Sequence, residues 1–168
     1  PLQYVDWYIK TFKATKDLNE RNAQRISLLN EFVTAFPIVN IPNLTLDTYS
    51  LGRGSQDSFC YWLEKKLGSL GRFSPGLAGT TVYGVYFSHE QNAFVSTDKT
   101  PQQKLDDIKS ALNTLLTTQN YTDAAAIFRK SFILKILSTY FPNEYFPIFS
   151  QNHLKLIAKI FEINTNGL

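Results

Sequence analysis

The stretch "SLGRGSQDSFCYWLEKKLGSLGRFSPG", residues 50–76, places one short helix between two glycine-rich loops. Ser55 or Asp57 is a suitable N-cap for a helix over residues 58–67. Glu64, Lys65 and Lys66 are predicted to face water. The residues that recur at helical spacing predict the face that anchors this helix in the core: Phe59, Trp62, Leu63 and Leu67.

A hairpin is predicted downstream of the second loop. Residues 68–79 contain four glycines and Pro75, which favours a long irregular loop. In "TTVYGVYFS", residues 80–88, bulky side chains occupy both alternating sets, which predicts a strand covered on both faces. "HEQN" then reads as a turn and "AFVST" as a second strand.

Helices are predicted on both sides of this central segment. Residues 3–16 place Tyr4, Tyr8 and Phe12 on one helical stripe. Asn19 is a candidate cap for a helix over 20–36 that Pro37 ends, and residues 38–49 read as extended. The expected apolar face of this second helix consists of Ile26, Leu29, Phe32, Val33 and Phe36.

The last third of the chain is predicted to be helical. After Pro101, apolar residues repeat at helical spacing, and Thr122 is a candidate cap for a helix over 123–140. Ser150 or Asn152 is expected to cap a final helix that ends near Phe161. The predicted class is therefore α+β, predominantly helical, with a small antiparallel β element in the middle of the chain.

The length of 168 residues favours a single recognition domain. We expect a helical lead-in over 1–48, the glycine loops, short helix and hairpin over 49–100, and a helical part over 101–168. The hydrophobic content of 43% is sufficient for a core. Because the sequence begins at Pro1 and contains no Met, we expect it to be excised from a larger protein.

The net charge of +3 permits an anionic partner without requiring one. The single cysteine, Cys60, excludes an internal disulfide and fits a reducing compartment. No apolar run approaches the ~20 residues that cross a membrane, and no signal peptide is recognised. These features predict a cytoplasmic protein with no membrane partner.

The usual catalytic and cofactor motifs are not found in the sequence. A P-loop needs Gly-x4-Gly-Lys-Ser/Thr, and the run from Gly52 has Asp57 where a dinucleotide fingerprint needs its third glycine. His89, His153 and Cys60 lie far apart, which disfavours a metal site. Cys60 lies among aromatic residues, where a thiol keeps a high pKa. We therefore expect no metal, no cofactor and no enzymatic activity in this chain.

Basic residues interleaved with aromatic ones are the strongest binding signal. Arginine and lysine anchor phosphates, and an exposed aromatic ring can stack on an extruded base. Lysines on a solvated helix face are the alternative interpretation of part of this set. The candidate DNA-binding residues are Arg53, Ser55, Lys65, Lys66, Arg72, Ser74, Tyr83, Tyr86, Arg129 and Lys130, with Tyr83 or Tyr86 as the stacking ring.

Three segments resemble the amino-terminal region of McrB-like AAA+ ATPases, the motor subunits of restriction systems. They are "YSLGRGSQDSFCYWLEKKLGSLG" at 49–71, "TVYGVYFS" at 81–88 and "ILSTYFPNEYFPIFSQNHLKLIAKIF" at 136–161. "FCYW" replaces a Pro-Trp pair of that family. The residues that match the family pattern are Gly52, Gly54, Phe59, Trp62, Gly84, Val85 and Tyr86.

The resemblance implies a DNA-binding specificity domain for phage defence, which in some relatives recognises a modified cytosine flipped out of the duplex. It also implies an AAA+ module in the same full-length chain and a separate nuclease subunit as partners. The two glycine loops would then form one rim of a DNA-facing surface. The alternative is a protein-interaction module that positions the motor or senses a partner protein. An electrostatic map discriminates the two, because a continuous basic cleft favours DNA and an apolar patch favours protein.

Overall fold

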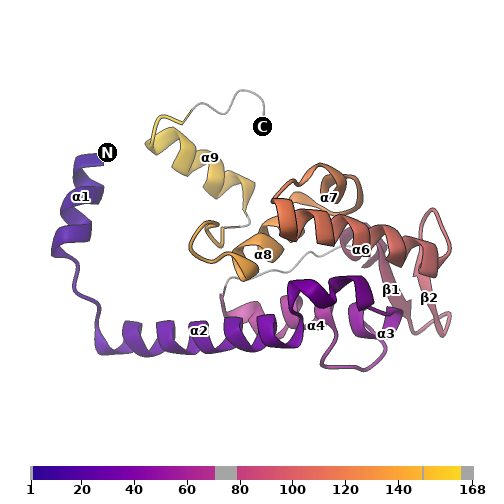
Figure 1. Ribbon diagram of the computed structural model, residues 1–168. Coiled ribbons are helices and arrows are strands. Elements are labelled where there is room, and N and C mark those ends of the chain that lie inside the picture. Colours follow the sequence, from indigo (N-terminus) through magenta and orange to yellow (C-terminus); the bar gives the residue numbers. More distant parts are fainter. Residues whose placement is uncertain (1, 71–78, 149, 164–168) are drawn as a thin grey trace.

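The computed structural model describes residues 2–70, 79–148 and 150–163, and it is mostly helical with one small antiparallel sheet (Figure 1). The predicted α+β class is confirmed. The elements in chain order are α1 (Leu2–Thr11), α2 (Lys16–Ala35), the 3₁₀ helix η1 (Ile38–Asn43), α3 (Leu46–Tyr49), α4 (Phe59–Glu64), the 3₁₀ helix η2 (Lys66–Leu70), α5 (Gly79–Tyr83), β1 (Val85–Ser88), β2 (Ala93–Ser96), α6 (Pro101–Thr118), α7 (Thr122–Ile127), α8 (Lys130–Tyr140) and α9 (Gln151–Ile160).

Helix α6 lies at the centre of the packed part and contacts η1, α7, β1 and β2. Its start is fixed by a capping box, in which the Gln103 backbone N–H donates to Thr100 Oγ1 at 3.3 Å and the Thr100 N–H donates to Gln103 Oε1 at 3.2 Å. The apolar face that the sequence predicts is confirmed, since its members are all buried: Leu105, Ile108, Leu112, Leu115 and Leu116.

Helix α4 carries the aromatic centre of the core. The predicted inward face of Phe59, Trp62, Leu63 and Leu67 is confirmed as buried. The cap is Ser58 rather than Ser55 or Asp57, because Ser58 Oγ accepts the Tyr61 N–H at 3.3 Å. The Phe59 ring lies 5.5 Å from Phe32, 5.3 Å from Phe36 and 5.9 Å from Tyr49, measured between centroids. These ring pairs join α2, α3 and α4 into one cluster.

The predicted hairpin is confirmed over β1 and β2, where Val85 pairs with Ser96 and Phe87 with Phe94. The predicted strand is wrong over its first half, because residues 79–83 form helix α5. Gly84 ends this helix with a φ of +78°, a left-handed conformation that glycine adopts without strain.

Two side chains of α8, the buried Lys135 and the partly buried Tyr140, connect it to distant elements. The Tyr140 hydroxyl donates to the Phe36 carbonyl at the end of α2, at 2.7 Å. The Lys135 ammonium donates to the Leu67 carbonyl in η2, at 2.8 Å. Each bond links segments more than sixty residues apart and fixes α8 against the aromatic cluster.

Both terminal helices stand away from this packed part (Figure 1). Helix α2 extends beyond it, and α1 rises from its far end. Thr15, not Asn19, caps α2, and the predicted apolar face is buried only in part, because Ile26 remains 48% exposed. Helix α9 begins at Gln151, and its cap is Ser150, one of the two caps predicted.

Two further predictions are wrong. Residues 38–43 and 46–49 are helical rather than extended, and Thr45 and Thr48 form a capping box for α3. The helix predicted over 123–140 is broken at Phe128, whose backbone is extended and whose ring is buried. Within the described residues, no helix is both long enough and apolar enough to span a membrane.

Candidate nucleic-acid interface

The first glycine loop is tied to the hairpin. The Phe87 backbone N–H donates to the Leu51 carbonyl at 3.0 Å. Gly52 has a φ of +111°, and a Cβ there would lie 2.5 Å from the Phe87 carbonyl oxygen. Only glycine therefore fits this approach, which fixes the position of Arg53 beside the sheet.

Arg53 is held by the protein itself. Its guanidinium forms an ion pair with Asp47, and it lies 5.8 Å and 5.6 Å from the ring centroids of Phe87 and Phe94. Both charged side chains are about half exposed, so the pair contributes little to stability. Its consequence is electrostatic, because the Arg53–Asp47 pair as a whole carries no net charge.

The two lysines of the central helix are paired in the same way. Lys65 Nζ lies 2.6 Å from Glu64 Oε1, and this hydrogen bond raises the pKa of Lys65. Lys66 Nζ lies 2.7 Å from Asp57 Oδ1 and 4.0 Å from the centroid of the Trp62 ring. We call Arg53 of the first glycine loop and the two lysines that follow α4, Lys65 and Lys66, the rim cations. Each of them faces its own carboxylate, and together these six groups carry no net charge.

Tyr83 is not available to stack on a base. It lies in α5 rather than on a strand, and its side chain is 2% exposed. Its hydroxyl donates to Glu64, its carbonyl accepts the Tyr49 O–H at 2.7 Å, and its ring meets that of Phe132 at 5.2 Å. Burial, and then the bond to Glu64, raises the pKa of Tyr83. We assign this side chain a structural role.

Tyr86 is the stacking candidate that remains. It lies on β1 opposite Val95 and is half-buried. Its ring packs against α5, since a Cβ at Gly79 would lie 2.6 Å from Tyr86 Cγ. Ser55 is exposed, and its Oγ accepts the Asp57 N–H at 3.2 Å.

The other predicted contacts lie elsewhere. Arg72 and Ser74 lie outside the described residues. Arg129 is the N-cap of α8 and Lys130 its first residue, both exposed and without a capping side chain. Within the part of the chain that the structure describes, neither has a carboxylate oxygen within 4.0 Å.

The thiol of Cys60 is fully buried, and burial raises its pKa, as its aromatic neighbours predict. It is therefore protonated at neutral pH. Across residues 2–70, 79–148 and 150–163, no group of three His, Cys, Asp or Glu side chains is arranged to hold a metal ion.

The sequence interpretation missed the surface of α1. Tyr4 and Tyr8 lie on α1 as predicted, but the helix ends at Thr11 rather than continuing to residue 16, so Phe12 follows its last residue. All three rings face solvent, and Trp7 beside them is 63% exposed. The Tyr8 and Phe12 rings stack at 4.9 Å. Helical periodicity shows which side chains share a face but not what covers them, so this exposure could not be predicted from the residue pattern.

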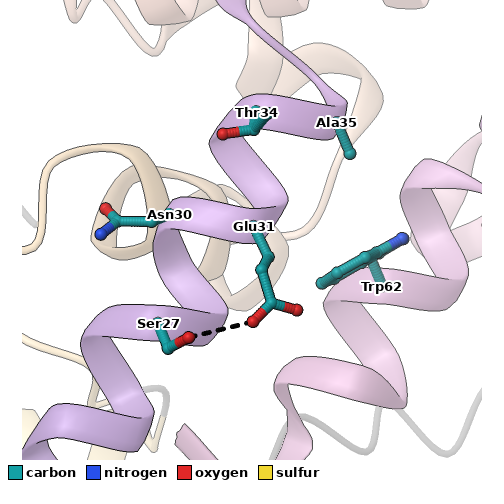
Figure 2. Close-up of a pocket in the computed structure, with 6 residues that line it drawn as sticks. All are labelled: Ser27, Asn30, Glu31, Thr34, Ala35 and Trp62. Carbon is teal, nitrogen blue, oxygen red and sulfur yellow. Dashed lines mark hydrogen bonds between the residues drawn. The ribbon is translucent and has the colours of Figure 1, made fainter.

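A second missed feature is a hollow between α2 and α4 (Figure 2). It has a volume of about 520 Å³. Its lining residues are Ser27, Asn30, Glu31, Thr34, Ala35 and Trp62.

Comparison with family models, with curated proteins and with solved structures found no match to this chain.

Proposed function

We propose that this chain is a protein-interaction module that binds its partner through the exposed aromatic face of α1, formed by Tyr4, Trp7 and Tyr8 together with Phe12, the residue that follows the helix. The observation that carries the proposal is the exposure of these four rings, which ranges from 45% to 78%. Large aromatic side chains are enriched where protein surfaces meet, because they bury much area and lose few rotamers.

The size of the aromatic face supports this function. Four rings at these exposures present on the order of 500 Å² of apolar surface. A typical monomer has no larger patch than this, and such patches are often functional. The face also lies on a helix that stands away from the packed part, where a partner can reach it (Figure 1).

The ion pairs of the rim cations also favour a protein partner over DNA. Arg53, Lys65 and Lys66 each lie beside a carboxylate, so the described part of the rim is neutral. In the setting that the resemblance to McrB-like subunits implies, the module would position an AAA+ motor in the same cytoplasmic assembly, or sense a partner protein. Hydrolysis and cleavage would belong to that motor and to a separate nuclease.

Site-specific photo-crosslinking tests the proposal. We would replace Tyr8 with p-benzoylphenylalanine in the full-length protein, irradiate cells and identify the products by mass spectrometry. Tyr121 is the matched control, because it is an aromatic residue of the packed part and is 61% exposed. We expect a discrete crosslinked protein from position 8 and none from position 121.

A second variant measures the contribution of one ring. Trp7→Ser is expected to cost about 2 kcal/mol of binding free energy, or ~30-fold in Kd, as for a central aromatic residue of an interface.

Crosslinks of equal yield from positions 8 and 121, or products from position 8 that are nucleic acid only, would refute the proposal.

DNA recognition remains a second candidate, and Arg129 with Lys130 is the observation that favours it. Two cations at the start of α8 lie at the positive end of the helix dipole, which opposes them by about 0.3–1 kcal/mol each. A bound phosphate would remove this conflict. The resemblance to McrB-like subunits, some of which read modified cytosine, points in the same direction.

Mobility shifts at two salt concentrations separate the candidates. The panel contains unmodified, 5-methylcytosine and 6-methyladenine duplexes. If DNA binds at α8, the double variant Arg129→Ala with Lys130→Ala lowers the salt slope by about two. Arg53→Ala, which removes a cation already paired with Asp47, is the matched control and should leave the slope unchanged. An unchanged slope in the double variant would exclude α8 as the site.

A further inference from the structure

Helix α9 carries a second apolar surface that is exposed. Of its described side chains, only Ala158 is buried, and none belongs to the core cluster. Leu156 and Ile160 lie four residues apart on one face and are 55% and 49% exposed. Glu162 has a left-handed φ of 55°, and the Ile163 N–H donates to the Ala158 carbonyl at 2.8 Å, which fixes the exposed Ile163 at the end of the helix. We call Leu156, Ile160 and Ile163 the α9 face.

Other exposed apolar side chains are scattered. Among the described residues outside α1, α2 and α9, the large ones are Val39, Tyr121 and Phe146. They lie on η1, at the start of α7 and in the segment before α9. Single exposed apolar residues are ordinary, whereas a group of them marks an interaction surface. The α1 and α9 faces are therefore the two apolar surfaces that call for a partner.

Helix α2 holds α1 away from the packed part of its own chain. Residues 16–24 are exposed throughout, and the first buried residue of α2 is Leu29. At 1.5 Å per residue, this exposed arm extends about 13 Å. Helix α1 lies at its far end (Figure 1). A terminal helix on such an arm is placed to reach a neighbouring molecule, as in the exchange of identical elements between copies.

The two faces together supply the area that a stable dimer needs. The aromatic face of α1 presents on the order of 500 Å², and the half-exposed side chains of the α9 face add about 300 Å². A symmetric dimer that uses both faces buries about 800 Å² per copy, which is the standard size of a specific interface. Two α1 faces packed on each other would bury only about 500 Å² per copy and would leave the α9 face in water.

The two faces also match in length and chemistry. Helices α1 and α9 have 10 residues each, so each spans about 15 Å. Apolar side chains recur on both at intervals of three and four residues, the spacing with which two helices interdigitate. No member of either face is charged, so the contact would remove no ion from water.

We propose that the partner of the α1 aromatic face is a second copy of this chain, whose α9 face it covers. The contact is reciprocal, so α1 of each copy packs on α9 of the other, and the dimer has two-fold symmetry. This inference rests on the proposed function, because it names the protein that the α1 face binds.

Crosslinking between two chains of different size tests the contact. One full chain carries Tyr8→Cys and a tag that increases its mass, and the other carries Ile160→Cys. The native Cys60 is buried and should not react. With a short bismaleimide, we expect a product that joins tagged and untagged chains. Tyr121→Cys in place of Ile160→Cys is the matched control and should give none. Equal yields from the two mixtures, or no product from either, would overturn the proposal.

Sedimentation velocity measures the assembly itself. We expect twice the monomer mass at high concentration. Ile160→Asp places a charge in both contacts of the dimer and should weaken it at least about tenfold per contact, or ~100-fold in all. Val39→Asp is the matched control, because Val39 is an apolar residue of η1 that is 78% exposed, and it should change nothing. A monomer at every concentration, or equal weakening by both variants, would contradict the inference.

Photo-crosslinking from position 8 separates failure of this inference from failure of the proposed function. A second copy of the chain as the crosslinked protein supports both. A different protein overturns the dimer and leaves the proposed function standing. The absence of any crosslinked protein overturns both.

Discussion

Replacement of Lys135 by Met should change how the stability of the fold depends on pH. Lys135 is a lysine in the core, with 2% of its surface exposed and its ammonium 2.8 Å from the Leu67 carbonyl. Burial lowers the pKa of Lys135 from its ordinary value of 10.5 to about 8. The cause is loss of hydration, which penalises the charged form.

The direction of the effect follows from proton binding. Between pH 8 and pH 10.5 the unfolded chain keeps the proton of Lys135 and the folded chain has lost it. Stability rises with pH wherever the unfolded state binds more protons, so this side chain stabilises the fold as pH increases. The two pKa values give a gain of about 2 kcal/mol between pH 7 and pH 9.5.

Urea unfolding at pH 7 and pH 9.5, followed by circular dichroism, measures this gain. Burial raises the pKa of Cys60, which opposes the gain in the same range, so the test compares wild type with Lys135→Met, in which the cysteine contribution cancels. The stability of wild type relative to the variant should increase by about 2 kcal/mol.

Lys130→Met is the matched control, because Lys130 is an exposed lysine of the same helix. Its stability relative to wild type should be the same at both pH values. If the Lys135→Met difference were also independent of pH, the buried side chain would have an ordinary pKa and the reasoning from burial would be wrong.

Two further substitutions test the contacts that position the first glycine loop and α5. Gly52→Ala should destabilise the fold by at least about 2 kcal/mol in urea unfolding, because its φ is +111° and the new Cβ would meet the Phe87 carbonyl oxygen. Gly54→Ala, with a φ of +84° and open space, should cost only about 1 kcal/mol, and equal losses would contradict this account. Tyr49→Phe leaves a buried carbonyl of α5 without its donor and should lower the melting temperature, with a loss of about 1–3 kcal/mol. Tyr121→Phe, at an exposed site, should change stability by less than about 0.5 kcal/mol, and a similar loss from both would contradict a special role for the Tyr49 hydroxyl.

The elements that could be predicted from sequence are those whose pattern and caps agree. Helix α6 has a Thr100 cap, a proline at its first position and an apolar face of constant spacing. The hairpin has two β-rich runs on either side of a polar turn. In both, local preference and burial point to the same structure, so tertiary contacts had nothing to override.

The elements that sequence did not predict are those whose secondary structure is not set by local preference alone. Residues 80–82 are β-branched and Tyr83 is aromatic, all types that favour strands, yet they lie in α5, where Val82 and Tyr83 are both buried and Gly84 turns the chain into β1. The break at Phe128 has neither proline nor glycine. The buried Phe128 ring lies 5.2 Å from the Phe132 ring, but an unbroken helix would also bring these i, i+4 side chains together, so this contact does not explain the break.

Part of the candidate site was missed for a related reason. Arg53 and Lys66 lie at the surface or near it, each against at least one aromatic ring and beside a carboxylate. Their partners, Asp47 and Asp57, lie six and nine positions away in the sequence, outside the spacing of any one helix. Counting charged residues along the sequence therefore identified these cations but could not show which carboxylates pair with them. The hollow beside Glu31 is likewise formed by two helices and has no signature in either one.

Helix α1 supports the proposed interaction on thermodynamic grounds. It has 10 residues, and none of its described side chains belongs to the core cluster. A helix shorter than about 12–15 residues is marginal in water, because nucleation costs more than so few hydrogen bonds return. In proteins, most helical stability comes from packing of an amphipathic face. The face that carries Trp7 and Tyr8 is therefore both the part of α1 that water disfavours and the part whose burial would stabilise the helix. A protein that covers this face would bind more tightly for two reasons, because apolar surface is buried and because the helix is stabilised. A DNA phosphate backbone would do neither.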